Sequence, residues 1–110
     1  MRKIEIKIND KDYLLEMNRN SIKWLENHGF SIADFEKKPI TYFDLIWSSL
    51  FITNHKDISE EETINLLEQY EKENNVTEVI KFAIEEYTSF MNALAVTNSK
   101  ENKNLKIIEA

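Results

Sequence analysis

The segment TYFDLIWSSLFITN, residues 41–54, places large apolar side chains on almost every side of a helix. These side chains are Phe43, Leu45, Ile46, Trp47, Leu50, Phe51 and Ile52. A helix that is apolar nearly all round is typical of the buried centre of a small domain. We therefore expect a helix at 42–54 to form the centre of the core.

Upstream, the chain begins with two runs that alternate apolar and polar residues. Ile4, Ile6 and Ile8 alternate with charged residues, and Tyr13, Leu15 and Met17 do so after the polar NDKD. Alternation with period two predicts strands with one buried face, and the Asn-Asp-rich connection predicts a β-hairpin at 2–17. An isolated hairpin is marginal in water, so its isoleucine face must rest on helices.

Two short helices are expected between the hairpin and the central helix. Asn18 or Asn20 can cap a helix at 19–28, and Gly29 can take the left-handed position that ends it. SIAD and TYFD place a Ser or Thr three residues before an Asp, which predicts helix starts at Ser31 and Thr41. Pro39 separates them, so the first of these helices should cover 32–38.

Downstream, two further helices and a tail are expected. SEEE at 59–62 is a capping box that begins an acidic helix at 60–73, and Asn75 can cap a helix at 76–95. The apolar residues of the second follow one stripe; they are Val76, Ile80, Ala83, Tyr87, Phe90 and Leu94. The polar stretch 97–110 predicts a flexible tail. The fold class is then α+β, mainly α, with the hairpin packed on about five helices in one globular domain at 1–96.

Composition narrows the classes of function. The chain has 110 residues, a net charge of -6 and no cysteine. An acidic balance argues against a binder of nucleic acid, which needs Lys and Arg to displace counterions. The longest apolar stretch is broken by Asp44 and is shorter than the roughly 20 residues that cross a bilayer, and the start has no apolar block of a secretion signal. We expect a protein of a reducing cytoplasm that contacts neither nucleic acid nor membrane.

The residues that could carry chemistry do not form a reactive pattern. His28 and His55 lie in no metal-ligating motif, and each suits a helix end, where the dipole favours a cation. The carboxylates of 57–73 fit a solvated helix face better than an acid–base pair. One glycine cannot build a phosphate loop, and Ser48 and Ser49 have no nearby histidine. The sequence predicts no catalytic residue, no metal site, no cofactor and no enzymatic activity.

Apolar surface offers another kind of function. The central helix carries more apolar area than one hairpin and a few short helices cover, and surplus area forms a groove for another helix or a self-association face. On this ground we select Trp47, Phe51, Tyr87, Met91 and Leu94 as residues that contact a partner or a second copy. A homo-oligomer is one of the two outcomes that such a surface allows.

The order of parts in the first half resembles the small tail assembly chaperones of long-tailed bacteriophages, particularly those of phages and prophages of low-GC Gram-positive bacteria. The resemblance covers KIEIKINDKDYLLEMNRNSIKWLENHGFSIADFEKKPITYFDLIWSSL, from Lys3 to Leu50. It rests on the hairpin pattern, an aromatic helix that ends in glycine and Phe, and a P-[ILV]-T leading into an apolar helix. These features are Ile4, Ile6, Tyr13, Leu15, Asn18, Trp24, Gly29, Phe30, Pro39, Ile40 and Thr41. The second half agrees in length and helicity.

The resemblance implies a non-enzymatic protein that binds the tape measure protein, a very long and largely helical chain. It would keep that client soluble while tail tube subunits polymerise around it, and the tail tube protein is a second expected partner. The expected location is the cytoplasm of the bacterial host, and the finished virion should lack the protein. Many members of this family also exist as a longer product made by ribosomal frameshifting.

Another class of function stays open from the residues alone. A small acidic regulator or inhibitor that imitates nucleic acid would also carry an excess of carboxylates. Such a protein should spread acid along one whole face, whereas here the acid is concentrated in 57–73. Salt-sensitive binding to a DNA-binding protein would favour this alternative.

Overall fold

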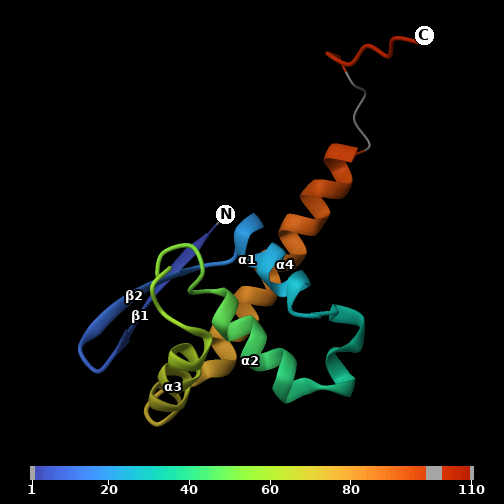
Figure 1. Cartoon of the computed structure of the whole chain (residues 1–110). Coiled ribbons are helices and arrows are strands. Elements are labelled where there is room, and N and C mark those ends of the chain that lie inside the picture. Colours follow the sequence, from blue (N-terminus) through green and yellow to red (C-terminus); the bar gives the residue numbers. More distant parts are fainter. Residues whose placement is uncertain (1, 99–102, 110) are drawn as a thin grey trace.

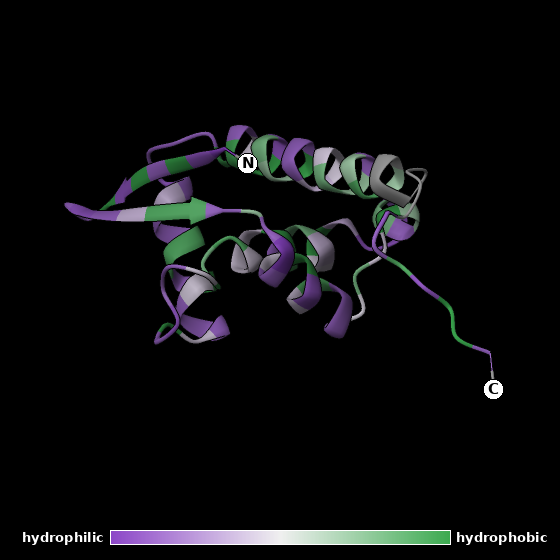
Figure 2. Ribbon diagram, turned by 90° about the horizontal axis from the view of Figure 1, so that it is seen from above, coloured by the Kyte–Doolittle hydropathy of each residue, from purple (hydrophilic) through white to green (hydrophobic). Residues whose placement is uncertain are grey.

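The structure is a computed structural model that describes residues 2–98 and 103–109, and within them an N-terminal hairpin is followed by five helices (Figure 1). The elements are β1 (Lys3–Ile8), β2 (Lys11–Glu16), α1 (Arg19–Asn27), the 3-10 helix η1 (Ile32–Lys37), α2 (Pro39–Ser49), α3 (Glu60–Glu71) and α4 (Val76–Asn98). The expected α+β, mainly α, class is confirmed. In Figure 2, α4 lies along one side of the molecule, and the hairpin projects at one end with its hydrophilic turn outermost.

The hairpin is closed by a two-residue turn. Asn9 and Asp10 have φ values of 50° and 65°, and positive φ at both central residues is what a type I′ turn requires. The strands are antiparallel and Ile6 lies opposite Tyr13. Ile6 and Tyr13 are both buried, whereas the flanking Lys7 is exposed. The predicted alternation therefore places one face of the hairpin on the helices.

Helix α1 begins and ends at the residues that the sequence indicates. The side chain of Asn18 accepts a hydrogen bond from the N–H of Ser21, and the Ser21 hydroxyl reciprocates, so Asn18 rather than Asn20 is the cap. At the other end Gly29 has a φ of 80°. The N–H of Phe30 then donates to the carbonyl of Leu25 over 3.0 Å, as in a Schellman motif.

We expect Gly29→Ala to lower the free energy of unfolding by about 1 kcal/mol, the approximate strain of an L-residue in the left-handed region. An added Cβ would meet no atom within 4 Å, so the loss is one of backbone conformation alone. Urea denaturation followed by circular dichroism measures it. Gly29→Asn is the matched control and should lose less, because Asn tolerates this conformation. Equal losses in both variants would contradict this explanation.

Helix α2 begins earlier than expected, and the prediction of a start at Thr41 was wrong. Pro39 is the first helical residue, because its fixed φ suits that position and its missing N–H needs no partner there. The preceding Lys38 makes no side-chain cap hydrogen bond. Ser31 likewise makes none at the start of η1, which is a 3-10 helix and ends at Lys37. Neither Ser31 nor Thr41 therefore caps a helix with its side chain.

Helix α2 also ends at Ser49, five residues before the expected end at 54. The Ser49 hydroxyl donates to the carbonyl of Ile46 over 2.6 Å, and the N–H of Leu50 donates to Trp47 as in a tightened last turn. Contacts with the hairpin hold the following turn. The N–H of Glu16 donates to the carbonyl of Leu50, and the side-chain amide of Asn54 donates to the Glu16 carboxylate over 2.9 Å. The chain therefore leaves the helix to join the end of β2.

The last two helices begin where expected. The Ser59 hydroxyl accepts from the N–H of Glu62, and Asn75 accepts from the N–H of Thr77. α3 ends at Glu71 rather than 73, and α4 continues to Asn98 rather than ending at 95, so the first residues of the expected tail are helical. The tail prediction for 99–102 and 110 lies outside the described residues. Residues 103–109 are exposed and form no helix or strand.

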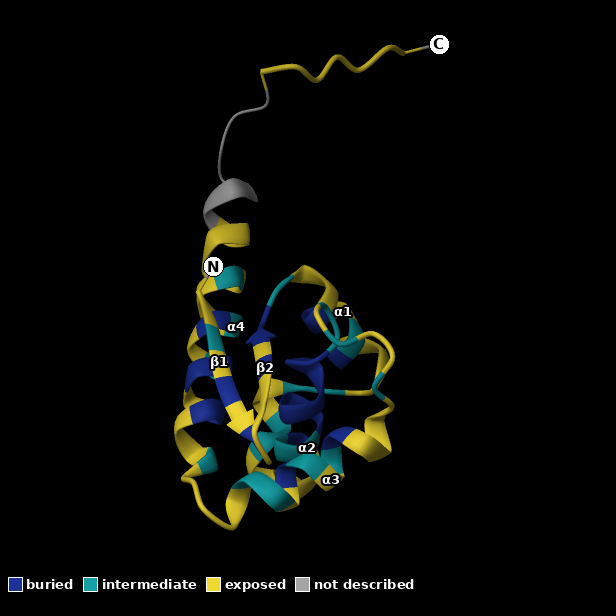
Figure 3. Ribbon diagram, turned by 90° about the vertical axis from the view of Figure 1, so that its left-hand side faces the viewer, coloured by how far each residue is buried: buried dark blue, intermediate teal, exposed yellow. Residues whose placement is uncertain are grey.

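The core is built around α2, as the sequence predicts. Trp47 and Leu50 have no exposed surface, and the hairpin covers them from one side with Leu15 and Met17. The Trp47 indole N–H donates to the carbonyl of Thr63 over 2.7 Å, which ties α2 to α3. In Figure 3 the buried residues gather between the hairpin, α2 and the lower part of α4.

Candidate functional site

The apolar stripe of α4 extends beyond the domain that it helps to build. We call residues 2–87 the body of the protein. Ile80 and Ala83 are buried, and Phe90 is half-buried at the edge of this body. The same stripe then continues to Met91 and Leu94, which are 39% and 36% exposed. Figure 3 shows this end of α4 as mostly exposed helix that stands clear of the other elements. We call residues 88–98 the α4 extension.

The α4 extension carries no charge. The first half of the helix has Glu78, Lys81 and Glu85 on its solvent side, but no Lys, Arg, Asp, Glu or His occurs between Glu86 and Lys100. Residues 88, 89 and 91–95 are nonetheless exposed. A helix that faces water on all sides normally carries charged residues there. An exposed, uncharged helix with an apolar stripe is instead typical of an interaction surface.

Ring contacts of Tyr87 and Phe90 with α1 and the residues after it lie at the base of the α4 extension. The ring of Tyr87 meets that of Phe30 edge-on at 5.6 Å, and the Arg19 guanidinium lies 5.3 Å from the Phe90 ring. Burial raises the pKa of the Tyr87 phenol, and the nearby Glu26 raises it further, so the hydroxyl stays neutral at physiological pH. Beyond Phe90 no further ring contact is seen among the described residues.

An ion pair between the exposed Arg2 and the buried Glu86 holds α4 below the extension. The Glu86 side chain is only 6% exposed and accepts from the Arg2 guanidinium over 2.5 Å. This hydrogen bond, together with a second one to Glu85, raises the pKa of Arg2 above its ordinary value. The Arg2 guanidinium also lies over the ring of Phe82. Arg2, next to the start of β1, therefore holds the middle of α4 in place. The α4 extension projects from this fixed part of the helix.

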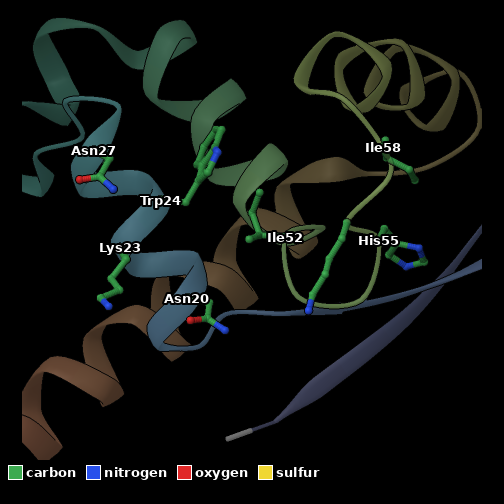
Figure 4. Close-up of a pocket in the computed structure, with 8 residues that line it drawn as sticks. Asn20, Lys23, Trp24, Asn27, Ile52, His55 and Ile58 are labelled. Atoms are coloured by element: carbon green, nitrogen blue, oxygen red, sulfur yellow. The ribbon is translucent and has the colours of Figure 1, made fainter.

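A second candidate is a shallow pocket of about 450 Å³ between α1 and the segment that follows α2 (Figure 4). Asn20, Lys23, Trp24 and Asn27 come from α1, and Ile52, His55, Lys56 and Ile58 from the other side. The Trp24 ring is already stacked on His28, with ring centroids 3.9 Å apart. The His55 ring lies against Tyr13 and Phe51, and its Nε2 is buried. Both aromatic rings therefore already contact other rings of the protein.

The acidic helix α3 presents its carboxylates to solvent. Glu60, Glu61 and Glu62 occupy the first turn, where the helix dipole favours negative charge. Burial raises the pKa of the Asp44 carboxyl on α2, and the charge of Glu68 on α3 raises it further. The charge of Glu68 therefore adds to the effect of burial at Asp44. Within residues 2–98 and 103–109, no three acidic or histidine side chains form a metal-ligating group.

We expect Asp44→Asn to raise the free energy of unfolding slightly at pH 7, by under about 1 kcal/mol because solvent screens the group. The folded-state pKa of Asp44 lies above its unfolded value, so the charged carboxylate opposes folding at neutral pH. This penalty falls as the pH drops through the folded-state pKa. Melting curves of both proteins from about pH 7 down to about pH 4 measure it. A difference that grows toward acid would contradict this assignment.

One known protein family matches nearly the whole chain. A sequence model of DUF5055, described as a domain of unknown function, matches residues 1–109. The chain belongs to the DUF5055 family. No curated protein and no solved structure matches it.

The structure divides the five selected contact residues of this DUF5055 chain into two groups. Trp47 and Phe51 are 0% and 1% exposed, so in the folded monomer they are core residues with no surface for a partner. The hairpin and α3 cover both side chains. These elements therefore bury more of α2 than the sequence led us to expect. Tyr87 is half-buried at the edge of the body, whereas Met91 and Leu94 lie exposed on the α4 extension.

The sequence contained a signal for the rest of this DUF5055 surface that apolar periodicity alone did not reveal. The signal is the lack of charge from residue 87 to 99, in a chain with 31% charged residues. It marks the α4 extension as a unit, including its small and polar residues. In the described part of the chain, no helix combines the length and apolar composition needed to cross a bilayer.

Proposed function

We propose that this chain is a tail assembly chaperone that binds the tape measure protein of a long-tailed phage or prophage and keeps it soluble while the tail tube assembles around it. The observation that carries the proposal is the uncharged, exposed α4 extension, into which the core-facing stripe of α4 continues. The client is expected to be a long helical chain with apolar stripes of its own.

The geometry suits this client. At a rise of 1.5 Å per residue the α4 extension is about 16 Å long, enough to lie along two to three turns of a client helix. Helices commonly recognise one another by laying apolar faces together. The chain has a net charge of -6, and the acidic first turn of α3 lies away from the extension. That charge would keep a complex with an apolar client in solution.

The resemblance in the first half of the chain supports the same class. Three of its characteristic residues lie at the ends of helices, where they help to specify the fold. Asn18 caps α1, Gly29 ends it and Pro39 begins α2. A chaperone of this kind would work in the cytoplasm of the bacterial host and be absent from the finished virion. The tail tube protein is then the second partner to examine.

Coexpression with the tape measure protein of the same genome tests the proposal. We expect the client to move from the insoluble to the soluble fraction and to co-purify with this chain. A client that stays insoluble and fails to co-purify would remove the main support. If the chain instead binds a DNA-binding protein in a strongly salt-sensitive manner, the acidic regulator becomes the better explanation.

A further inference from the structure

Among the described residues, Met91 and Leu94 of the α4 extension remain exposed in the free chain. The described part of the tail contains three large aliphatic side chains, and they are 64%, 78% and 82% exposed at Leu105, Ile107 and Ile108. They therefore do not pack on Met91 or Leu94. An apolar stripe that continues past the edge of the body in this way is favourable only when another surface removes it from water.

We propose that in the client-free protein the α4 extension pairs antiparallel with the same segment of a second copy. The lack of charge on the α4 extension favours a second copy as its partner. A charged partner helix would leave its own charges unpaired against an uncharged surface, whereas a second copy presents an equally uncharged one. The same patch on both copies gives an isologous, two-fold contact, which is the commonest form of homodimer.

The antiparallel direction follows from the placement of charge and from the helix dipoles. Side-by-side antiparallel helices place each positive end beside a negative one. The bodies of the two acidic chains, each chain with a net charge of -6, then lie at opposite ends of the paired segments and repel least. In the register centred between Met91 and Leu94, each Met91 faces the partner copy's Leu94. Phe90 of each copy then lies at one end of the contact, beside its own Arg19 and opposite Ala95 of the other copy.

The expected dimer is weak. An overlap of about 16 Å along one helix face falls short of the ~800 Å² per partner that a stable interface buries. A weak dimer shields the stripe in the free protein and still releases it to a longer client helix. The pairing needs no client, so it can hold or fail independently of the proposed function.

Sedimentation equilibrium of the full chain tests the pairing. Between about 5 and about 500 µM, the range in which small interfaces dissociate, we expect the mass to rise from 13.1 kDa toward twice that value. A mass that stays at 13.1 kDa throughout would overturn the proposal.

Two single variants locate the interface and its direction. Met91→Glu and Leu94→Lys should each weaken the dimer at least tenfold while leaving the circular dichroism unchanged, because both side chains are exposed in the monomer. Mixed in equal amounts, they should form a heterodimer through one new Glu–Lys contact and one intact Met–Leu contact. A dimer that survives both substitutions, or a mixture that stays monomeric, would overturn the antiparallel pairing.

Two control variants test surfaces outside the α4 extension. Ile40→Lys changes an exposed isoleucine on α2 and should leave the dimer unchanged. Ile107→Lys combined with Ile108→Lys should also leave it unchanged, because the tail is not part of the pairing. Loss of the dimer in the tail variant would place the interface on the tail and contradict the proposal.

Discussion

Trp47→Ala is expected to lower the free energy of unfolding by about 3–5 kcal/mol. The side chain has no exposed surface, and its ring lies 5.3 Å from Phe51 and 5.6 Å from Tyr70. Removing it opens a cavity at the centre of the core and removes the indole hydrogen bond to the Thr63 carbonyl. A small domain has only about 5–15 kcal/mol of stability, so much of the protein would unfold at 37 °C. Urea denaturation followed by circular dichroism measures the loss.

Trp47→Phe is the matched control for the cavity. It keeps an aromatic ring but removes the indole N–H, so we expect a smaller loss, of about 0.5–1.5 kcal/mol for the hydrogen bond to Thr63 together with part of the lost volume. If Trp47→Ala unfolded at the same urea concentration as the unmodified protein, the indole would not be a core residue. The account of Trp47 as structural rather than partner-binding would then fail.

The double variant Met91→Lys/Leu94→Lys should lose at least nine-tenths of the client recovered by coexpression and keep the stability of the fold. Both side chains are already exposed, so their replacement removes little packing from the monomer. Lys is a good helix former and suits the C-terminal part of a helix. On the α4 extension it places two charges in the middle of the apolar stripe. Soluble client per unit of chaperone, with thermal midpoints measured in parallel, reads out both effects.

Ile40→Lys is the control for an exposed apolar residue elsewhere. It removes an isoleucine that is 75% exposed on α2 and should recover as much client as the unmodified chain. Equal loss of client in Ile40→Lys and in the double variant would indicate non-specific apolar binding. Full recovery of client by the double variant would place the binding surface away from the α4 extension.

The sequence predicts best those features that depend on neighbours in the chain. The alternation of Ile4, Ile6 and Ile8 defines the hairpin face, and the ends of α1 follow from Asn18 and Gly29, because capping hydrogen bonds form between adjacent residues. Ser59 is a similar case at the start of α3. These features need no knowledge of the tertiary fold.

The features that were missed depend on distant contacts. Residues 50–54 continue the apolar pattern of α2, but Glu16 at the end of β2 binds Leu50 and Asn54 and draws the chain out of the helix. The burial of Trp47 and Phe51 likewise depends on how α3 and the hairpin close over α2. The α4 extension could not be recognised from its apolar stripe, since the stripe looks the same where it is covered and where it is not.

Amide hydrogen exchange along α4, with and without a fragment of the tape measure protein, tests most directly that the chain acts through the α4 extension. Exposed helix ends open easily, so in dilute free protein these amides should exchange quickly. The account predicts that the fragment slows exchange in residues 88–98 and leaves the acidic helix α3 unchanged. Protection that appears on α3 or around the pocket beside Trp24, with residues 88–98 unaffected, would contradict it.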